Sequence, residues 1–223
     1  MYLGTRKHTC SLKDSSHSIF LDGCKLSRVR DATFLGITID EKNHIEYICK
    51  KCSRNIGVLN KVKLFLPSAT MQQLYCTIVL PYLNYGLLLW GNAIKEYMTK
   101  VLRIQKRAIR TISNSSYLCP TKPLFAMYNL MNIYDMYTIE ASIFMYKYKY
   151  NLLPQSFNKC FTSNNDFHNY DTRNKENFNT RISKVKNLFT NGPKIWNDLP
   201  NELKHAKTLN QFKRKLKSQL LNL

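Results

Sequence analysis

Hydrophobic and polar positions change their spacing along the chain, and this change predicts two kinds of structure. In residues 1–40 the apolar runs are short; in SIFLDGCKL they flank Asp22 and Gly23, a pair typical of a two-residue hairpin turn. The run ATFLGITID predicts another short strand, in which Gly36 indicates a bulge or a close backbone approach. Residues 1–40 are therefore expected to form small β hairpins.

Beyond these hairpins the apolar positions follow helical spacing. A first stripe consists of Ile45, Ile48, Cys52, Leu59, Val62 and Leu66. Pro67 is expected to end this helix, and Ser68 is a candidate cap for the next one. Residues 95–113 predict a basic amphipathic helix, and residues 124–153 predict one or two helices that stop before Pro154.

A long segment without charge interrupts this pattern. No charged side chain lies between Leu64 and Ile94, and a membrane-spanning helix needs about 20 mostly apolar residues. Pro81 removes a backbone donor in the middle of the segment, and its tyrosines lie inside it rather than at its ends. We therefore expect two core helices, or one helix kinked at the proline, and no membrane span.

The C-terminal part of the chain begins with an Asn-rich stretch of weak periodicity. Residues 154–191 are expected to form an irregular linker, followed by a compact turn in GPKIWNDLP. Thr208 and Gln211 fit a capping box at the start of a last helix. Its apolar stripe contains Leu209, Phe212, Leu216, Leu220 and Leu223.

These patterns predict a mainly α fold with a small N-terminal β part, an α+β organisation. The expected segments are the β hairpins of residues 1–40, a helical region of residues 41–153, the linker of residues 154–191, and a turn with a basic amphipathic helix in residues 192–223.

Charge indicates the kind of partner. The chain carries 34 Lys and Arg against 14 Asp and Glu, a formal net charge of +20. Such an excess predicts a polyanionic partner, with nucleic acid ahead of an anionic membrane surface and ahead of a merely solvated surface. The first ten residues do not resemble a signal peptide, so the seven cysteines are expected to be reduced thiols of an intracellular protein. The sequence does not distinguish nucleus from cytoplasm.

One predicted helix concentrates the positive charge on a single face. Its cations are Lys100, Arg103, Lys106, Arg107 and Arg110, which span about 15 Å at the helical rise. No acidic residue lies between Glu96 and Asp135, whereas solvated helical faces usually mix both signs. We therefore expect this face, together with Lys50 and Arg54 of the preceding basic helix, to contact phosphates independently of base sequence.

Neither a metal site nor a catalytic site is predicted. Cys49 and Cys52 have the spacing of half a zinc site, but only His44 lies near enough in sequence to add a ligand, and a closed site needs four. A zinc module is therefore a less favoured alternative. The aspartates are all separated, so no adjacent carboxylate pair is available for two magnesium ions.

Several stretches together resemble the C-terminal end of reverse transcriptases from jockey-like non-LTR retrotransposons (LINE elements). In chain order they are ATFLGITID, HIEYICKKCSRNIGVLNKVKLFLP, LYCTIVLPYLNYGLLLWGN, LRIQKRAIRTI, LFAMYNLMNIYDMY, HNYDTR and GPKIWNDLPNELKHAKTLNQFKRKLK. One departure is the short IDEKNHIEY junction, where the family usually has a longer loop that contains a tryptophan.

The resemblance implies the end of a polymerase palm followed by a thumb-like helical region. Phe34, Leu35 and Gly36 would match the turn that supports the primer terminus, the primer grip. The implied partners are RNA or an RNA–DNA duplex, and the missing palm and fingers. The catalytic Y-A-D-D turn would lie before Met1, so this piece alone is expected to have no polymerase activity, and Mg²⁺ would serve only the complete polymerase. A remnant without function is the alternative.

Overall fold

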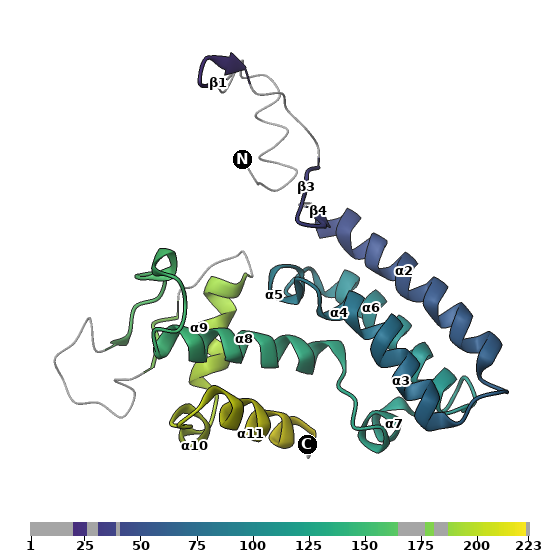
Figure 1. Ribbon diagram of the computed structural model, residues 1–223. Helices are drawn as coiled ribbons and strands as arrows, with labels where there is room; N and C mark the ends of the chain where they lie inside the picture. Colours follow the sequence, from purple (N-terminus) through teal and green to yellow (C-terminus); the bar gives the residue numbers. More distant parts are fainter. Residues whose placement is uncertain (1–19, 26–30, 39–40, 165–176, 181–186, 222–223) are drawn as a thin grey trace. The chain divides into compact units, whose positions relative to one another are not determined.

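A computed structural model of the chain describes residues 20–25, 31–38, 41–164, 177–180 and 187–221. The chain divides into two compact units, Met1–Ile39 and Asp40–Leu223. The first contains the described strands and the second contains the described helices, so the predicted mainly α fold with a small β part is confirmed (Figure 1).

The first unit contains two short antiparallel hairpins. In the first hairpin Asp22 and Gly23 have φ angles of 49° and 78°, the left-handed conformation that a two-residue hairpin turn requires. The predicted hairpin at this pair is thus confirmed. The strands are β1 (Phe20–Leu21) paired with β2 (Cys24–Lys25), and β3 (Thr33–Phe34) paired with β4 (Ile37–Thr38).

The expectation of one strand through ATFLGITID was wrong. Leu35 and Gly36 have φ angles of 48° and 75°, so the chain reverses between Phe34 and Ile37 and forms the second hairpin. Gly36 marks a turn here rather than a bulge. The sequence signal was weaker than at Asp22–Gly23 because Leu is seldom found in the left-handed region.

The named elements in the described part of the second unit are helices, and an isolated β-bridge joins Ser163 to Phe178. These helices are α2 (Glu41–Val62), α3 (Ser68–Ile78), α4 (Leu80–Asn84), α5 (Leu87–Trp90), α6 (Lys95–Ile112), α7 (Thr121–Met127), α8 (Ile133–Lys149), the 3₁₀ helix η1 (Gln155–Phe157), α9 (Leu188–Asn197), α10 (Asn201–Lys204) and α11 (Leu209–Leu221).

The uncharged segment forms the short helices α3, α4 and α5. Pro81 lies in the first turn of α4, where a missing backbone N–H is tolerated, and Gly86 precedes α5 with a φ of 63°. Tyr75 and Trp90 are almost fully buried in the hydrophobic core, as expected for core helices. In the part of the chain that the structure describes, no helix is both long and apolar enough to cross a bilayer. The N-cap of α3 is Pro67, so the expected cap at Ser68 was wrong.

A first core joins α2, α3, α6 and the start of α8, and a buried amide holds its centre. Gln105 on α6 donates through Nε2 to the Tyr75 hydroxyl at 3.1 Å and to the carbonyl oxygen of Met131 at 2.8 Å. Its Oε1 accepts from the backbone N–H of Ile133 at 2.9 Å. Because these polar groups are paired, the amide can lie in the core without a desolvation penalty of its own.

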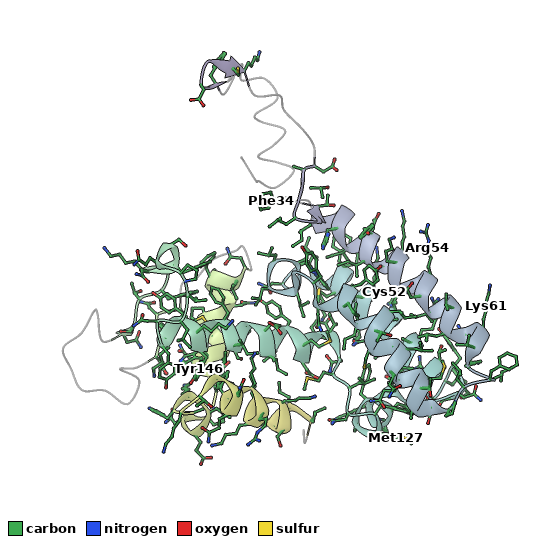
Figure 2. All side chains as sticks on the ribbon, viewed as in Figure 1. Phe34, Cys52, Arg54, Lys61, Met127 and Tyr146 are labelled. Carbon is green, nitrogen blue, oxygen red and sulfur yellow. The ribbon has the colours of Figure 1, made fainter. Side chains whose placement is uncertain are left out.

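A second core forms where α8, α9 and α11 meet. Trp196 is fully buried there beside Tyr146, whose ring stacks on Phe212 with centroids 4.6 Å apart (Figure 2). Phe161 and Phe178 also belong to this core. The described parts of the expected irregular linker 154–191 that contain Phe161 and Phe178 are thus packed in this core, and its last residues belong to α9. Residues 165–176 and 181–186 lie outside the described residues.

The expected turn around Trp196 was wrong, because GPKIWN lies in α9. Asn187 starts this helix with a capping box: its side chain accepts from the N–H of Thr190, and the Thr190 hydroxyl accepts from the N–H of Asn187. Pro193 lies inside the helix, where its ring and missing N–H would normally disfavour helix. Burial of Trp196 and the cap outweigh that local preference.

The last helix agrees with its predicted pattern. Phe212 and Leu216 are buried, and Leu209 and Leu220 pack beside them; Leu223 lies outside the described residues. The Thr208 hydroxyl accepts from the N–H of Gln211 at 3.2 Å, which is half of the predicted capping box. The other half differs, because Gln211 Oε1 accepts from the N–H of Lys207 at 3.1 Å.

Two glycines provide a matched test of this packing. A Cβ added at Gly57 on α2 would meet nothing within 4 Å, whereas at Gly91 it would lie 2.5 Å from the carbonyl oxygen of Leu87. We expect Gly57→Ala to raise the free energy of unfolding by about 0.5–1 kcal/mol, because alanine favours helix. Gly91→Ala is expected to lower it by about 1–3 kcal/mol through overpacking. Urea denaturation followed by circular dichroism measures both, and a stabilising Gly91→Ala would contradict the close packing of Leu87 and Tyr137 against Gly91.

Candidate nucleic-acid interface

The helices α2 and α6 lie side by side and run in the same direction. The Thr111 hydroxyl donates to Asn60 Oδ1 at 3.2 Å near their C-terminal ends. Nearer their N-terminal ends, burial raises the pKa of the Cys49 thiol, and the charge of Lys100 on α6 opposes this rise. Asn60 faces Thr111 and Cys49 lies near Lys100. The distance in sequence between the two contact positions is the same on both helices, so the helices are parallel and in register.

The basic face of α6 lies opposite its buried face. At about 100° per residue, Arg103, Lys106 and Arg107 project away from the side that holds Val101 and Ala108 in the core. Arg103 and Arg107 are exposed and Lys106 is half-buried. Within the described ranges, none of these three cations makes an ion pair or a hydrogen bond. Their charges are therefore available to an external anion.

Lys100 and Arg110, at the two ends of this face, have protein partners. Lys100 pairs with Glu96 at 3.7 Å, an exposed ion pair worth at most about 1 kcal/mol, and so remains able to exchange partners. Arg110 donates through Nε to the carbonyl oxygen of Cys119 at 2.9 Å, and its guanidinium lies 5.6 Å from the centre of the Tyr117 ring. Arg110 thus holds the α6–α7 connection, a role that its charge pattern did not indicate.

A second basic stripe follows the exposed side of α2. Lys50, Arg54 and Lys61 are all exposed, at helical spacing of four and seven residues. Arg54 and Lys61 project outward, whereas Cys52 points toward the neighbouring helices (Figure 2). Gly57 lies in the same stripe with open space above it. Lys61 was not among the predicted contact residues, although its spacing from Arg54 indicated the same face.

These two stripes form one surface, which we call the α2–α6 basic surface and define by Lys50, Arg54, Lys61, Lys100, Arg103, Lys106 and Arg107. Between Tyr47 and Tyr134 the sequence contains a single acidic residue, Glu96, and twelve basic ones. The α2 stripe spans about 16 Å from Lys50 to Lys61, and the α6 stripe spans about 10 Å from Lys100 to Arg107. These lengths match about three to five phosphates of one strand at 3.4 Å per residue along a duplex axis. The arrangement fits a polyanion that lies along both helices.

The two cysteines of α2 lie in or against the first core: Cys52 is buried and Cys49 is partly buried beside it. Burial raises the pKa of Cys52 to about 12, as expected for a thiol packed among apolar side chains. Among the residues described, no group of three or more His, Cys, Asp or Glu side chains is placed to hold a metal ion. The Cys49–Cys52 spacing is also the spacing of two neighbouring positions on the apolar side of α2.

The turn predicted to act as a primer grip lies in the first unit. Phe34 and Leu35 are exposed, by 67% and 73%, at the tip of the β3–β4 hairpin (Figure 2). Within the first unit, no other described residue covers these two side chains, so a ligand could reach the turn. Its function remains a prediction.

Comparison with known proteins relates this chain distantly to RNA-directed DNA polymerases of transposons, that is, to reverse transcriptases. The chain is 26% identical over 132 residues to the probable RNA-directed DNA polymerase from transposon BS of Drosophila melanogaster. The match covers 56% of this chain and 14% of that polymerase, so the chain spans only a small part of its relative. No protein-family model matches the chain. No solved structure matches it either.

Proposed function

We propose that this chain is a nucleic-acid-binding part of a non-LTR retrotransposon reverse transcriptase, and that its α2–α6 basic surface holds RNA or an RNA–DNA duplex. The observation that carries the proposal is the set of cations on two parallel, adjacent helices, of which only Lys100 has an ion-pair partner among the residues that the structure describes. The distant similarity to a transposon polymerase supports the choice of nucleic acid over other polyanions.

Binding on this surface would be electrostatic and independent of base sequence. The contributing side chains are lysines and arginines on exposed helical faces, which reach phosphates without entering a groove. Each phosphate that they neutralise releases condensed counterions into solution, so the affinity should fall steeply with salt. In the wider assignment, residues 41–153 act as a jockey-like thumb region downstream of a polymerase palm, and the turn of Phe34, Leu35 and Gly36 acts as its primer grip.

The proposal also assigns the chemistry to parts outside this chain. The aspartates of the described residues are separate, with Asp22 and Asp31 in the first unit and Asp135 and Asp198 on different helical segments of the second. A two-metal polymerase mechanism needs carboxylates that share a pair of metal ions about 4 Å apart. We therefore propose that the chain alone does not polymerise, and that its protein partners are the palm and fingers that carry those carboxylates.

Sequence independence is the first property to test. Fluorescence anisotropy with two labelled RNA–DNA duplexes of unrelated sequence should give dissociation constants within about threefold of each other. Heparin should displace both, because it competes for the same cations. Binding to anionic vesicles but to neither duplex would contradict the proposal and favour the membrane-surface alternative. Absence of both binding activities from a folded protein would favour the remnant without function.

A further inference from the structure

The end of the α2–α6 pair where both helices stop exposes large apolar side chains. Leu64 and Phe65, in the α2–α3 connection, are 75% and 82% exposed. Tyr117 and Leu118, in the α6–α7 connection, are 81% and 87% exposed. We call these four residues the loop tip.

Both halves of the loop tip leave the bundle at the same end. The helices are parallel, and the hydrogen bond from Thr111 to Asn60 joins their last turns. Helix α2 ends at Val62 and α6 ends at Ile112, so each connection starts within a turn of this bond. The loop tip therefore continues the α2–α6 basic surface beyond the helix ends.

The exposure of these side chains is a local feature with a defined backbone. Leu66, next to Phe65, packs against the first core, and the N–H of Phe65 donates to the carbonyl oxygen of Val62 at 3.0 Å. The side chain of Leu66 therefore packs against the core, while the side chains of Leu64 and Phe65 are exposed to solvent. On the other connection, the Arg110 guanidinium lies 5.6 Å from the Tyr117 ring centre.

Cations surround the loop tip. Lys61 and Lys63 come just before Leu64 in the sequence, Arg110 lies beside Tyr117, and Lys122 follows the second connection. The sequence contains no acid between Glu96 and Asp135 to compensate them. An apolar partner alone would leave these charges without counter-ions, whereas a nucleic-acid strand supplies both phosphates and aromatic bases. Exposed rings beside a basic track are how proteins bind unpaired bases.

We propose that the loop tip binds unpaired bases of a strand that continues from the duplex on the α2–α6 basic surface. Phe65 and Tyr117 provide stacking surfaces, with the Tyr117 ring backed by Arg110, and Lys61 and Lys63 contact the phosphates between stacked bases. This inference rests on the proposed function, because the duplex along α2 and α6 brings the single strand to the tip. It adds a preference for duplexes with a single-stranded extension.

The test compares three probes of related backbone: a blunt RNA–DNA duplex, the same duplex with a short single-stranded extension, and one whose extension is abasic. Wild-type protein should bind the duplex whose extension carries bases at least about tenfold more tightly than the duplex whose extension is abasic. Stacking of one base on one aromatic ring is enough for a difference of this size. In Phe65→Ala/Tyr117→Ala this preference should vanish, while affinity for the blunt duplex stays within about twofold, because no phosphate-contacting cation is removed. Circular dichroism confirms that both proteins are folded.

A second variant separates stacking from simple hydrophobic contact. Phe65→Leu/Tyr117→Leu keeps apolar side chains but removes the aromatic faces, so it too should lose the preference for bases over abasic extension. Preserved preference in either double variant overturns the inference, as does equal binding of the two extensions by wild type. If wild type binds the blunt duplex without preferring bases, the inference fails and the proposed function stands. If it binds none of the probes, both fail.

Discussion

Replacing Arg103, Lys106 and Arg107 together by glutamine is expected to lower affinity for an RNA–DNA duplex by about 100-fold at about 100 mM salt. Near this salt concentration each phosphate contact contributes up to about tenfold through counterion release. None of these three side chains has an ion pair or hydrogen-bond partner in the described parts of the structure, so their loss should leave the fold intact. Titration by fluorescence anisotropy at fixed salt measures the change.

The chain offers a control with the same change in net charge. Lys213, Arg214 and Lys215 are three exposed cations on α11. This helix packs in the second core, whereas α2 and α6 pack in the first. Their replacement by glutamine should lower duplex affinity by less than about threefold, through the general field alone. If both triple variants lose affinity equally, the net charge of the chain explains binding and the α2–α6 assignment is wrong.

Replacing Trp196 by alanine is expected to cost about 3–5 kcal/mol of unfolding free energy, the range for large core side chains. Its ring is fully buried and has three aromatic neighbours, Tyr146, Phe178 and Phe212, with centroids 6.0–6.5 Å away. The cavity would open between α8, α9 and α11. Because domains are stable by only about 5–15 kcal/mol, loss of this ring should unfold much of the second core at moderate urea concentrations.

Replacing Trp196 by phenylalanine separates the contribution of aromatic packing from that of the indole N–H. No acceptor in the described part of the chain pairs with Trp196 Nε1, so Trp196→Phe keeps most of the packing and removes an unpaired N–H. It should cost less than about 2 kcal/mol. Urea denaturation followed by far-UV circular dichroism measures both variants. A Trp196→Ala protein as stable as wild type would show that α9 does not depend on this core.

Where the sequence predicted the structure correctly, several local preferences agreed with tertiary packing. The apolar stripe of α2, the charge-free helices around Tyr75 and the hairpin at Asp22–Gly23 each combine a clear pattern with suitable turn or boundary residues. The helices of the charge-free run between Leu64 and Ile94 were correctly expected to contribute to a core, because proline and internal tyrosines argued against a bilayer. The exposed side chains of Leu64 and Phe65 at the start of this run are an exception.

The failures occurred where distant contacts override a local preference. Pro193 and Gly192 favour a turn, yet the capping box at Asn187 and the burial of Trp196 hold them in α9. Leu35 has little preference for the left-handed region, so its turn was read as a strand. These outcomes depend on residues far from the motif, which a pattern within a short window does not contain.

The candidate surface was predicted only in part, for a related reason. Charge spacing indicated which face of each helix carries the cations, but not that α2 and α6 are parallel neighbours. It also could not reveal that Arg110 holds the α6–α7 connection through Cys119 and Tyr117, since that contact depends on the path of the loop. The exposed rings of the loop tip were likewise unpredictable, because apolar residues are usually assigned to a core.

The central claim is that cations of the α2–α6 basic surface contact phosphates directly. Its most direct test is the slope of log affinity against log salt concentration for one RNA–DNA duplex, measured with wild type and with the Arg103, Lys106 and Arg107 triple variant. At about −0.9 per phosphate contact, one contact for each of the seven surface cations gives wild type a slope of about −6, and the variant, which keeps four of them, a slope of about −4. Equal slopes for the two proteins would contradict the claim.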